Sequence, residues 1–500
     1  MGMIYLVGAG PGDAGLITVR GADCLRRADV VLYDYLVNPD LLRHAPHTAE
    51  RICLGSHGST RIWSQDEIHA RMAEDAAQGK TVVRLKGGDP AVFAHIGDEM
   101  EFLAARHIPY EVVPGITAAW AVSSYAGIPL THRDRELASA VALITGQETP
   151  HKDQPTLDYH ALAMFPGTLV FYMGVTTSAR WSQALIAAGK PADTPVAMVR
   201  RCSCPDQQIV RCTLAEVAER LTPRQKLPPP VIILVGPVVN DTSAFSWFDQ
   251  RPLFGQRILV TRPITADDAL RDRLREWGAD VIESPVITIG PPPDWHPVDG
   301  VIDRLSDFDW VVFSSCNGVE FFLQRVLSRG RDMRALGRAR LAAIGPGTAE
   351  RLLHYQLRAD VIPDEYRAES LAAALAEQVR GQQVLLIRAS RGREVLAETL
   401  TAHGACITQV VAYRSEDVAS APPEVLQRLQ DGKIDWVTVT SSAIARSLVR
   451  LFGESLRHAR LASISPVTSA TLRELSFSPD VEASPHDTIG LAEAIRQACQ

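Results

Sequence analysis

Short apolar runs alternate with amphipathic helical patterns along nearly the whole chain of 500 residues. Typical runs in the first half are MIYLV (3–7), DVVLY (29–33) and TVVRL (81–85). Strands that alternate with helices in this way pair mostly in parallel, with helices covering the faces of the sheet. The alternation therefore predicts an α/β protein built of such layers.

The alternation is interrupted at residues 239–256 (VNDTSAFSWFDQRPLFGQ), which are rich in polar, aromatic and proline residues. It restarts directly afterwards with the strand-like run RILVTRP (257–263). A chain of this length is expected to form about two to four domains. We therefore expect a linker at 239–256 that joins two halves.

The second half contains an internal repeat. DWVVFSSCNGVEFF (309–322) resembles DWVTVTSSAIARSL (435–448), and ARLAAIGPGTAERL (339–352) resembles ARLASISPVTSATL (459–472). The repeat predicts two similar α/β lobes within 257–500. Each serine- and threonine-rich turn leads into a helix, where hydroxyl groups cap backbone N–H groups and leave others for an anion. The alternative for each turn is a helix cap without a ligand.

The first strand of the chain runs into a glycine-rich loop with Gly8, Gly10 and Gly12. A dinucleotide-binding loop has a third glycine three residues after the second, where the helix packs on the strand. Asp13 occupies that position, and Pro11 removes one backbone donor. The loop therefore suits a neutral or cationic ligand better than a diphosphate. The alternative is a βα turn that binds no ligand.

Composition narrows the class of protein. The chain is 46% hydrophobic and 22% charged, with a net charge of −7, so nucleic-acid binding is not expected. Apolar runs are too short to span a bilayer, and the N-terminus lacks the layout of a signal peptide, so we expect a cytoplasmic protein without membrane contact. Among the eight cysteines, Cys202, Cys204 and Cys212 cluster, but with a poor spacing for zinc. We expect reduced structural thiols and no metal.

Five motifs in the first half identify a family. VGAGPGD, VLYDYLV, RLKGGDPAVF, VVPGITAA and GIPLTHR occur in the order and near the spacing of the tetrapyrrole methylases, and resemble most the uroporphyrinogen-III C-methyltransferases. The resemblance covers residues 3–237 and implies a two-lobed fold, with lobes at 1–115 and 116–238, that usually dimerises. It also implies S-adenosylmethionine as cofactor. The residues that would contact it are Pro11, Gly87, Gly88, Asp89, Val92, Thr117, Ala118, Met173 and Cys202.

A sulfonium cation suits a site of backbone carbonyls and a carboxylate, and phosphate-binding amides are not required. The electron-rich pyrrole carbon of a porphyrinogen attacks the methyl group once the two are held in contact, so orientation supplies much of the rate. A base must then remove a proton. The resemblance assigns this role to Asp34, which follows an apolar strand, a setting that can raise a carboxyl pKa. The alternative for Asp34 is a turn or cap residue.

The sequence departs from the family pattern at several positions. Ser56 stands where the family has a lysine that is assigned as proton donor, and serine is no cationic acid near neutral pH. We hypothesise that His57 or Arg61 replaces that lysine. Other departures are Tyr35 and His95, each in place of arginine, and Cys202 in place of a glycine that contacts the cofactor.

The implied acceptor carries eight carboxylates, so basic residues are expected to line its cleft. The candidates are Arg84, Lys86, His132 and Arg133, of which Arg133 lies in the LTHR motif and is preferred. The alternative for each is ordinary surface charge.

Residues 257–500 resemble uroporphyrinogen-III synthase through ILVTRP, DWVVFSSCNGV, AAIGPGTA, VLLIRASRGRE, VVAYRSE, VTVTSSAIA and ASISPVTSATLRE. The resemblance implies two α/β lobes joined by a pair of linking strands, and ring closure of hydroxymethylbilane. Tyr413 matches the family's preferred acid, with a buried structural tyrosine as the alternative. Ser465 replaces a glycine. The substrate-binding candidates are Ser314, Ser315, Thr440, Ser441, Ser442, Thr468 and Ser469.

The two resemblances describe consecutive steps, because the product of the synthase is the substrate of the methylase. Together they imply a bifunctional enzyme that acts on small tetrapyrroles and leads to precorrin-2, in the sirohaem or the cobalamin branch. Two alternatives stay open. The methylase half either acts on another acceptor, such as a corrinoid precursor or an RNA base, or is a silent module that binds S-adenosylmethionine beside an active synthase.

Overall fold

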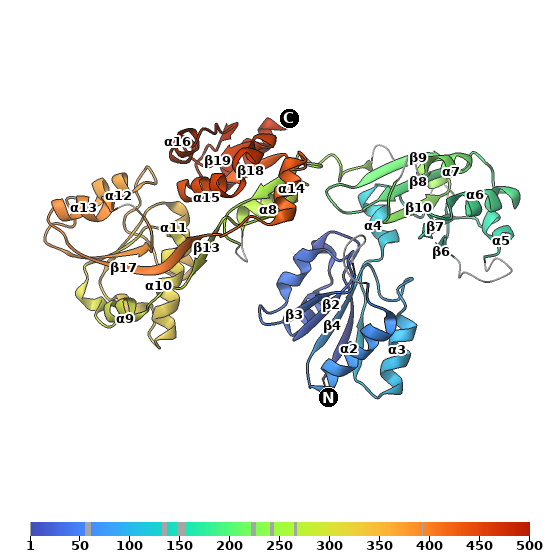
Figure 1. Ribbon diagram of the computed structural model, residues 1–500, viewed down its shortest axis with the longest axis horizontal. Coiled ribbons are helices and arrows are strands. Elements are labelled where there is room, and N and C mark those ends of the chain that lie inside the picture. Colours follow the sequence, from blue (N-terminus) through green and yellow to red (C-terminus); the bar gives the residue numbers. More distant parts are fainter. Residues whose placement is uncertain are drawn as a thin grey trace. The chain divides into compact units, whose positions relative to one another are not determined.

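The computed structural model describes residues 2–55, 62–132, 138–147, 157–221, 227–240, 245–264, 268–392 and 394–500 (Figure 1). The chain divides into two compact units. The first consists of Met1–Gln256, Leu274–Asp280 and Cys499–Gln500, and the second of Arg257–Arg273 and Val281–Ala498. In the described part of the chain, no helix has the length and apolar character needed to cross a membrane.

The first sheet of the first unit is fully parallel, in the order β3-β2-β4-β1-β5. The central strand β4 is buried along its whole length, as expected for a strand covered by helices on both faces. The strands are β1 (Ile4–Gly8), β2 (Val30–Tyr33), β3 (Glu50–Cys53), β4 (Val82–Lys86) and β5 (Tyr110–Val113). The helices are α1 (Val19–Arg26), α2 (Gln65–Ala77), α3 (Ile96–Ala105) and α4 (Ala118–Tyr125).

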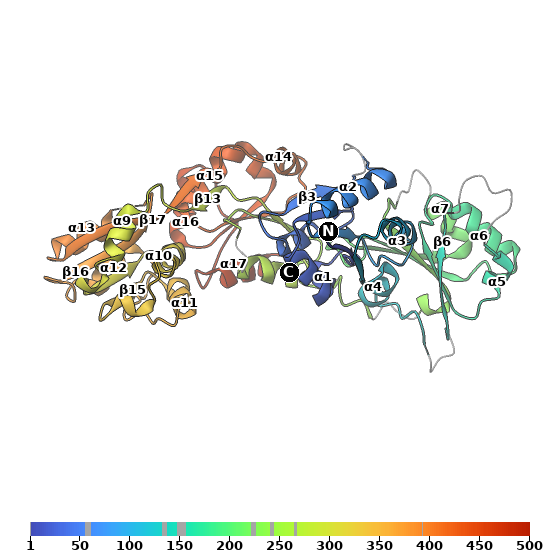
Figure 2. The same cartoon turned by 90° about the horizontal axis from the view of Figure 1, so that it is seen from below.

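The second sheet has the order β6-β7-β10-β8-β9, and only β6 and β7 pair in parallel. The expectation of a largely parallel sheet is wrong here, because β8 and β9 are joined by a connection too short for a parallel crossover. The helices α6 and α7 pack side by side (Figure 2). The elements are β6 (Val141–Thr145), α5 (Tyr159–Ala163), β7 (Thr168–Tyr172), α6 (Ser178–Ala187), β8 (Pro195–Arg200), β9 (Gln208–Thr213), α7 (Val217–Arg220) and β10 (Val231–Val235).

Residues 245–256, which lie in the segment expected to be a linker, pack against α4. The ring of Tyr125 lies 5.2 Å from that of Trp247 and 4.8 Å from that of Phe248, between ring centroids. Trp247 Nε1 donates to Ser124 O at 2.8 Å, and Phe248 is buried. Aromatic burial of this kind makes the segment part of the first unit.

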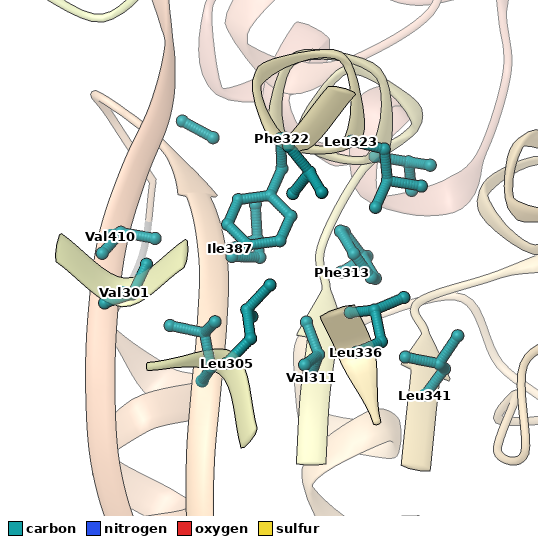
Figure 3. Close-up of a cluster of buried hydrophobic side chains, with 14 of the residues drawn as sticks. Val301, Leu305, Val311, Phe313, Phe322, Leu323, Leu336, Leu341, Ile387 and Val410 are labelled. Carbon is teal, nitrogen blue, oxygen red and sulfur yellow. The ribbon is translucent and has the colours of Figure 1, made fainter. Parts of the chain in front are cut away.

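The first lobe of the second unit has the sheet order β13-β17-β16-β14-β15. The strands β13 and β17 pair antiparallel and the remaining pairs are parallel. Phe322 on α10 packs on Phe313 and Ile387 of the sheet (Figure 3). The elements are β13 (Ile287–Gly290), α9 (His296–Ile302), β14 (Trp310–Phe313), α10 (Cys316–Ser328), β15 (Arg340–Ala343), α11 (Pro346–His354), α12 (Ala368–Leu375), β16 (Gln383–Ala389), α13 (Val395–Ala402) and β17 (Cys406–Asp417).

The second lobe has the order β12-β11-β18-β19-β20, and β11, β18, β19 and β20 pair in parallel. The antiparallel pair β13 and β17 links the two lobes (Figure 1). The elements are β11 (Arg257–Val260), α8 (Ala269–Glu276), β12 (Asp280–Glu283), α14 (Pro423–Gln430), β18 (Trp436–Val439), α15 (Ser442–Phe452), β19 (Arg460–Ser463), α16 (Pro466–Glu474), β20 (Val481–Glu482) and α17 (Thr488–Ala498).

The internal repeat predicted from the sequence is confirmed in three dimensions. In the first lobe, the Arg340 guanidinium lies 4.2 Å from the centre of the Trp310 ring, across β15 and β14. In the second lobe, Arg460 lies 4.0 Å from the centre of the Trp436 ring, across β19 and β18. The same strand–helix–strand–helix order, with the same cation–π pair, therefore occurs in both lobes.

Candidate active sites

Three glycine loops meet at the carboxyl ends of β1, β4 and β5. A Cβ on Gly8 would lie 2.5 Å from Gly115 Cα, and one on Gly115 would lie 2.3 Å from Gly88 O. Gly10 and Gly88 exchange backbone hydrogen bonds, N to O, of 3.2 and 2.8 Å. These approaches leave no room for a side chain. The three loops that contain the motifs VGAGPGD, GGDP and VVPGITAA are thus in direct backbone contact with one another.

Asp89 fastens the third loop to the second. One carboxylate oxygen accepts from Ala91 N at 2.8 Å and the other accepts from Gly115 N at 2.9 Å. The side chain that was expected to face the cofactor therefore supports the loops around it. The backbone beside it is open: the nearest described atom to a Cβ on Gly87 would be Leu36 Cβ at 3.6 Å, and for Gly88 Ala118 N at 4.0 Å.

This open backbone suits the cofactor that the motifs imply. A ligand can approach the backbone of Gly88 without meeting a described side chain, and that of Gly87 beside Leu36. Gly88 has a φ of +71°, which glycine adopts freely. Peptide carbonyls and nearby carboxylates are compatible with a sulfonium group. The residues of this edge therefore fit S-adenosylmethionine.

Other expected cofactor residues lie around the same edge. Tyr172 Oη lies 2.7 Å from the buried Thr117 Oγ1 and accepts a hydrogen bond from Ala119 N at 2.9 Å, so the Thr117 hydroxyl is engaged within the fold. Met173 is 46% exposed, with a φ of +54°. Pro11, Val92 and Ala118 are half-buried.

Asp13 does not present a free carboxylate to a ligand. One oxygen accepts from Gly15 N at 2.8 Å and caps the short helix Ala14–Leu16. The other accepts from Tyr125 Oη at 2.9 Å, and burial together with Asp13 raises the pKa of Tyr125. The acid in the glycine loop therefore holds the fold together.

Cys202 lies beside the first glycine loop through its backbone. A Cβ on Gly12 would lie 2.8 Å from Cys202 O, and Asp13 N donates to Ser203 Oγ at 3.0 Å. Burial raises the pKa of the Cys202 thiol, and that of Cys204 to about 11, so both stay protonated near neutral pH. All eight cysteines are free thiols, as expected.

Asp34 lies at the end of β2, next to the second glycine loop. Its Oδ1 forms an ion pair of 2.6 Å with Arg84 Nη2, and its Oδ2 accepts a hydrogen bond of 3.3 Å from Gly87 N. The expected apolar setting is therefore wrong, because a guanidinium contacts the carboxylate directly. The carboxylate still borders the open backbone.

The sequence suggested that Arg84 and Lys86 line a cleft, but both side chains are buried. They are 3% and 2% exposed and both contact Glu99, which is fully buried. Glu99 was missed by sequence reasoning, although it lies one helical turn before the buried Leu103 on α3, and that spacing signals a buried face.

The remaining expected residues of the first half are mostly in segments that the structure does not describe. Ser56, His57, Arg61 and Arg133 lie outside the described residues. The backbone N of His132 donates to Ala138 O at 2.9 Å.

In the first lobe of the second unit, the structure brings Ser314, Ser315 and Tyr413 together. Ser315 Oγ lies 2.9 Å from Tyr413 Oη and accepts from Gly318 N at the start of α10. Ser314 Oγ donates to Ile387 O at 3.0 Å. Tyr413 is 7% exposed, and burial raises the pKa of its phenol.

The candidates in the second lobe separate into two groups. Thr440, Ser441 and Ser442 are half-buried at the end of β18, and Ser441 Oγ caps α15 by accepting from Ile444 N. Thr468 and Ser469 are buried instead, and the Ser469 hydroxyl donates to Glu482. Their side chains serve the packing of α16, so the expectation that these two hydroxyls bind substrate is not supported.

Comparison with known proteins addresses both halves. The model of the tetrapyrrole (corrin/porphyrin) methylases matches residues 3–218, and that of uroporphyrinogen-III synthase HemD matches residues 268–493. The porphyrin biosynthesis protein HemD of Ruminiclostridium josui is 35% identical over 467 residues, which are 93% of this chain and 91% of that protein. The chain belongs to the tetrapyrrole methylases in its first half and to the uroporphyrinogen-III synthases in its second. Both resemblances drawn from the motifs are confirmed.

Two further relatives are a methyltransferase and a siroheme synthase. The uroporphyrinogen-III C-methyltransferase of Bacillus subtilis is 40% identical over 340 residues, 67% of this chain and 68% of that protein. Siroheme synthase 1 of Yersinia pseudotuberculosis is 46% identical over 252 residues, so the match spans 50% of this chain and 52% of that protein. Tetrapyrrole methylases use S-adenosylmethionine as methyl donor, in line with the open backbone of Gly87 and Gly88.

The convergence of the glycine loops predicts the effect of one methyl group. Gly115→Ala forces a Cβ against Gly88 O, so we expect the free energy of unfolding of the first unit to fall by about 2 kcal/mol. Chemical denaturation followed by circular dichroism measures this change. Gly97→Ala is the matched control, because a Cβ there meets no described atom within 4 Å and alanine favours α3. Equal stability of the two variants would contradict the prediction.

Proposed function

We propose that the chain catalyses two consecutive steps of tetrapyrrole synthesis. The second half cyclises hydroxymethylbilane to uroporphyrinogen III, and the first half transfers methyl groups from S-adenosylmethionine to carbon atoms of that product, giving precorrin-2. The observation that carries the methylase proposal is the carboxylate of Asp34 beside the bare backbone of Gly87 and Gly88. The fusion supports the choice of acceptor, because one half makes what the other consumes.

The chain's own residues bind the methyl donor and orient it toward the acceptor. S-adenosylmethionine supplies an electrophilic methyl group when bound. We assign its contacts to the edge formed by the glycine loops, with Met173 and Ala118 as exposed or half-exposed neighbours. The residues proposed to hold it are Pro11, Gly87, Gly88, Val92, Thr117, Ala118, Met173 and Cys202, with Asp89 supporting the loops.

Asp34 is the proposed base of methyl transfer. The pyrrole carbon of the acceptor gains the methyl group, and the ring then loses a proton, which neutralises the positive charge left on it. Asp34 accepts that proton, while Arg84 and Gly87 N fix the position of the carboxylate. Arg133 is the proposed contact for substrate carboxylates.

Tyr413 is the proposed acid of ring closure. The phenol donates a proton to the hydroxyl group of hydroxymethylbilane, which leaves as water, and Ser315 orients the phenol. Burial raises the pKa of Tyr413, so the proton is present throughout the neutral range. Ser314, Ser315, Thr440, Ser441 and Ser442 are the proposed contacts for substrate carboxylates, on the turns that end β14 and β18.

The cellular setting follows from the chemistry. The substrates are small, polyanionic tetrapyrroles, so we propose a cytoplasmic enzyme whose partners are small molecules and not nucleic acid or membrane. We also propose that it forms a homodimer through the methylase half.

The test of the proposed function is one incubation of the full chain with hydroxymethylbilane and S-adenosylmethionine, followed by mass and visible absorbance. A dimethylated product is expected. Uroporphyrinogen III without added methyl groups would leave the synthase proposal standing and make the first half a silent module or a methylase for another acceptor. Uroporphyrinogen III supplied directly tests the methylase alone.

Asp34→Asn removes the proposed base while keeping the shape of the side chain. We expect the methylation rate to fall by about 100-fold, with the affinity for S-adenosylhomocysteine retained. Initial rates with uroporphyrinogen III and calorimetric binding measure the two quantities. The exposed Asp193→Asn is the control for loss of a carboxylate elsewhere in this unit. A methylation rate equal to that of the control would remove Asp34 from the mechanism.

Tyr413→Phe removes the proposed acid of the synthase. We expect ring closure to slow by about 100-fold while methylation of supplied uroporphyrinogen III is unchanged. Because the pKa of Tyr413 is raised above the usual value near 10, the parent rate should show no basic limb from this group between about pH 6 and about pH 9. Tyr355→Phe in the same lobe is the control. A Tyr413→Phe rate equal to the parent rate would assign Tyr413 to packing.

A further inference from the structure

Four charged side chains meet behind the candidate methylase site. Arg84 and Lys86 come from β4, Glu99 from α3 and Asp34 from the end of β2. Arg84, Lys86 and Glu99 are 3%, 2% and 0% exposed, whereas Asp34 is half-buried at the edge of the group. Two positive and two negative charges therefore share a largely dry space.

Glu99 contacts both cations through one oxygen. Its Oε1 lies 2.6 Å from Lys86 Nζ and 3.3 Å from Arg84 Nε. A buried charge without a partner destabilises a fold strongly. Since Asp34 pairs with Arg84 alone among the ion pairs of the described residues, Glu99 is the anion that balances Lys86.

The guanidinium of Arg84 is held through both of its terminal nitrogens. Its Nη2 contacts Asp34 Oδ1 at 2.6 Å and its Nη1 donates to Leu85 O at 3.2 Å. Its Nε lies 3.3 Å from Glu99 Oε1 as an ion pair and has no hydrogen-bond partner within the described chain. A planar guanidinium fixed in this way has one direction left for Asp34. The orientation of the Asp34 carboxylate at Gly87 thus depends on the arrangement behind it.

The second oxygen of Glu99 indicates what keeps this residue in place. Glu99 Oε2 is buried and has no hydrogen-bond partner within the described chain. A buried oxygen without a partner costs stability, so the contacts of Oε1 with the two cations have to offset that cost. A glutamate whose role was limited to filling space would be replaced here by an apolar side chain at lower cost.

We infer that Glu99 is a positioning residue for methyl transfer. By pairing with Lys86 and attracting the Arg84 guanidinium across 3.3 Å, it keeps Arg84 directed at Asp34, and so keeps the Asp34 carboxylate at Gly87 in the orientation that accepts the proton. The inference rests on the proposed role of Asp34 as base. Glu99 itself touches neither cofactor nor substrate.

Loss of the charge at position 99 has a defined consequence. Among the described residues of this group, Asp34 is then the one anion left beside two cations, and Lys86 competes with Arg84 for it. In the described part of the chain, the charged and titratable groups that face Asp34 are Arg84 and Lys86 from β4, with Glu99 behind them on α3 and Tyr35 beside it in the chain. The added positive potential makes Asp34 a weaker base and moves the acidic limb of the kcat profile to lower pH.

The test compares Glu99→Gln, Lys86→Met and the double variant in the full chain, with uroporphyrinogen III as acceptor. Glu99→Gln is expected to lower kcat by about 100-fold and to shift the acidic limb, with the KM for S-adenosylmethionine and the affinity for S-adenosylhomocysteine unchanged. The double variant removes one charge of each sign, so its kcat is expected to recover by at least about tenfold over Glu99→Gln. Glu101→Gln, an exposed carboxylate on the same helix, is the matched control.

The outcomes separate the inference from the proposed function. No methylation by the parent chain overturns the proposed function. An active parent with an equally active Glu99→Gln variant overturns the inference alone. A double variant no faster than Glu99→Gln also overturns it, since charge balance would then have no part. If Glu99→Gln does not fold, the charge-balanced double variant decides: the inference requires that it folds and is more active than Lys86→Met.

Discussion

The first unit depends on the contact of bare peptide backbone at Gly8, Gly88 and Gly115. At this point three strands end close enough that a methyl group on Gly8 or Gly115 would meet the backbone of a neighbouring loop, while Gly88 has a φ of +71°, which suits glycine. The contact sets where Asp34 and the open peptides of the GGDP loop lie. The Asp89 carboxylate holds Gly115 at this contact, whereas the Asp13 carboxylate joins the first glycine loop to Tyr125 on α4.

Electrostatics and geometry are combined differently in the two halves. In the first, a group of buried charges sums to zero and leaves one carboxylate at its edge, so the position of a base follows from the balance behind it. In the second, a buried phenol keeps its proton because burial raises the pKa of Tyr413, and the neutral hydroxyl of Ser315 lies 2.9 Å from it. On the proposed function, one half thus holds a proton acceptor in place and the other holds a proton donor.

The sequence alone predicted the α/β class and the repeated lobes, because strand periodicity and turn chemistry are local. The family resemblance implied that residues of the glycine motifs contact one cofactor. It did not predict the partners of buried charges. Arg84 and Lys86 looked like cleft residues, since nothing in RLKGGDP shows that Glu99 on a later helix neutralises them. Thr468 and Ser469 looked like substrate-binding residues, because the sequence does not show that they are buried. The burial of a turn depends on the helix packed over it. The direction of β8 and β9 depended on the length of the turn between them.

The packing of residues 245–256 on α4 also bears on how such a fused enzyme is assembled by evolution. The aromatic side chains of this segment cover Tyr125, whose hydroxyl reaches Asp13 in the first glycine loop. A gene fragment that ended after the last strand of the first unit would therefore lose the cover over that tyrosine. The methylase part of the fusion therefore extends at least to Gln256, and the first unit also takes in Leu274–Asp280 and Cys499–Gln500.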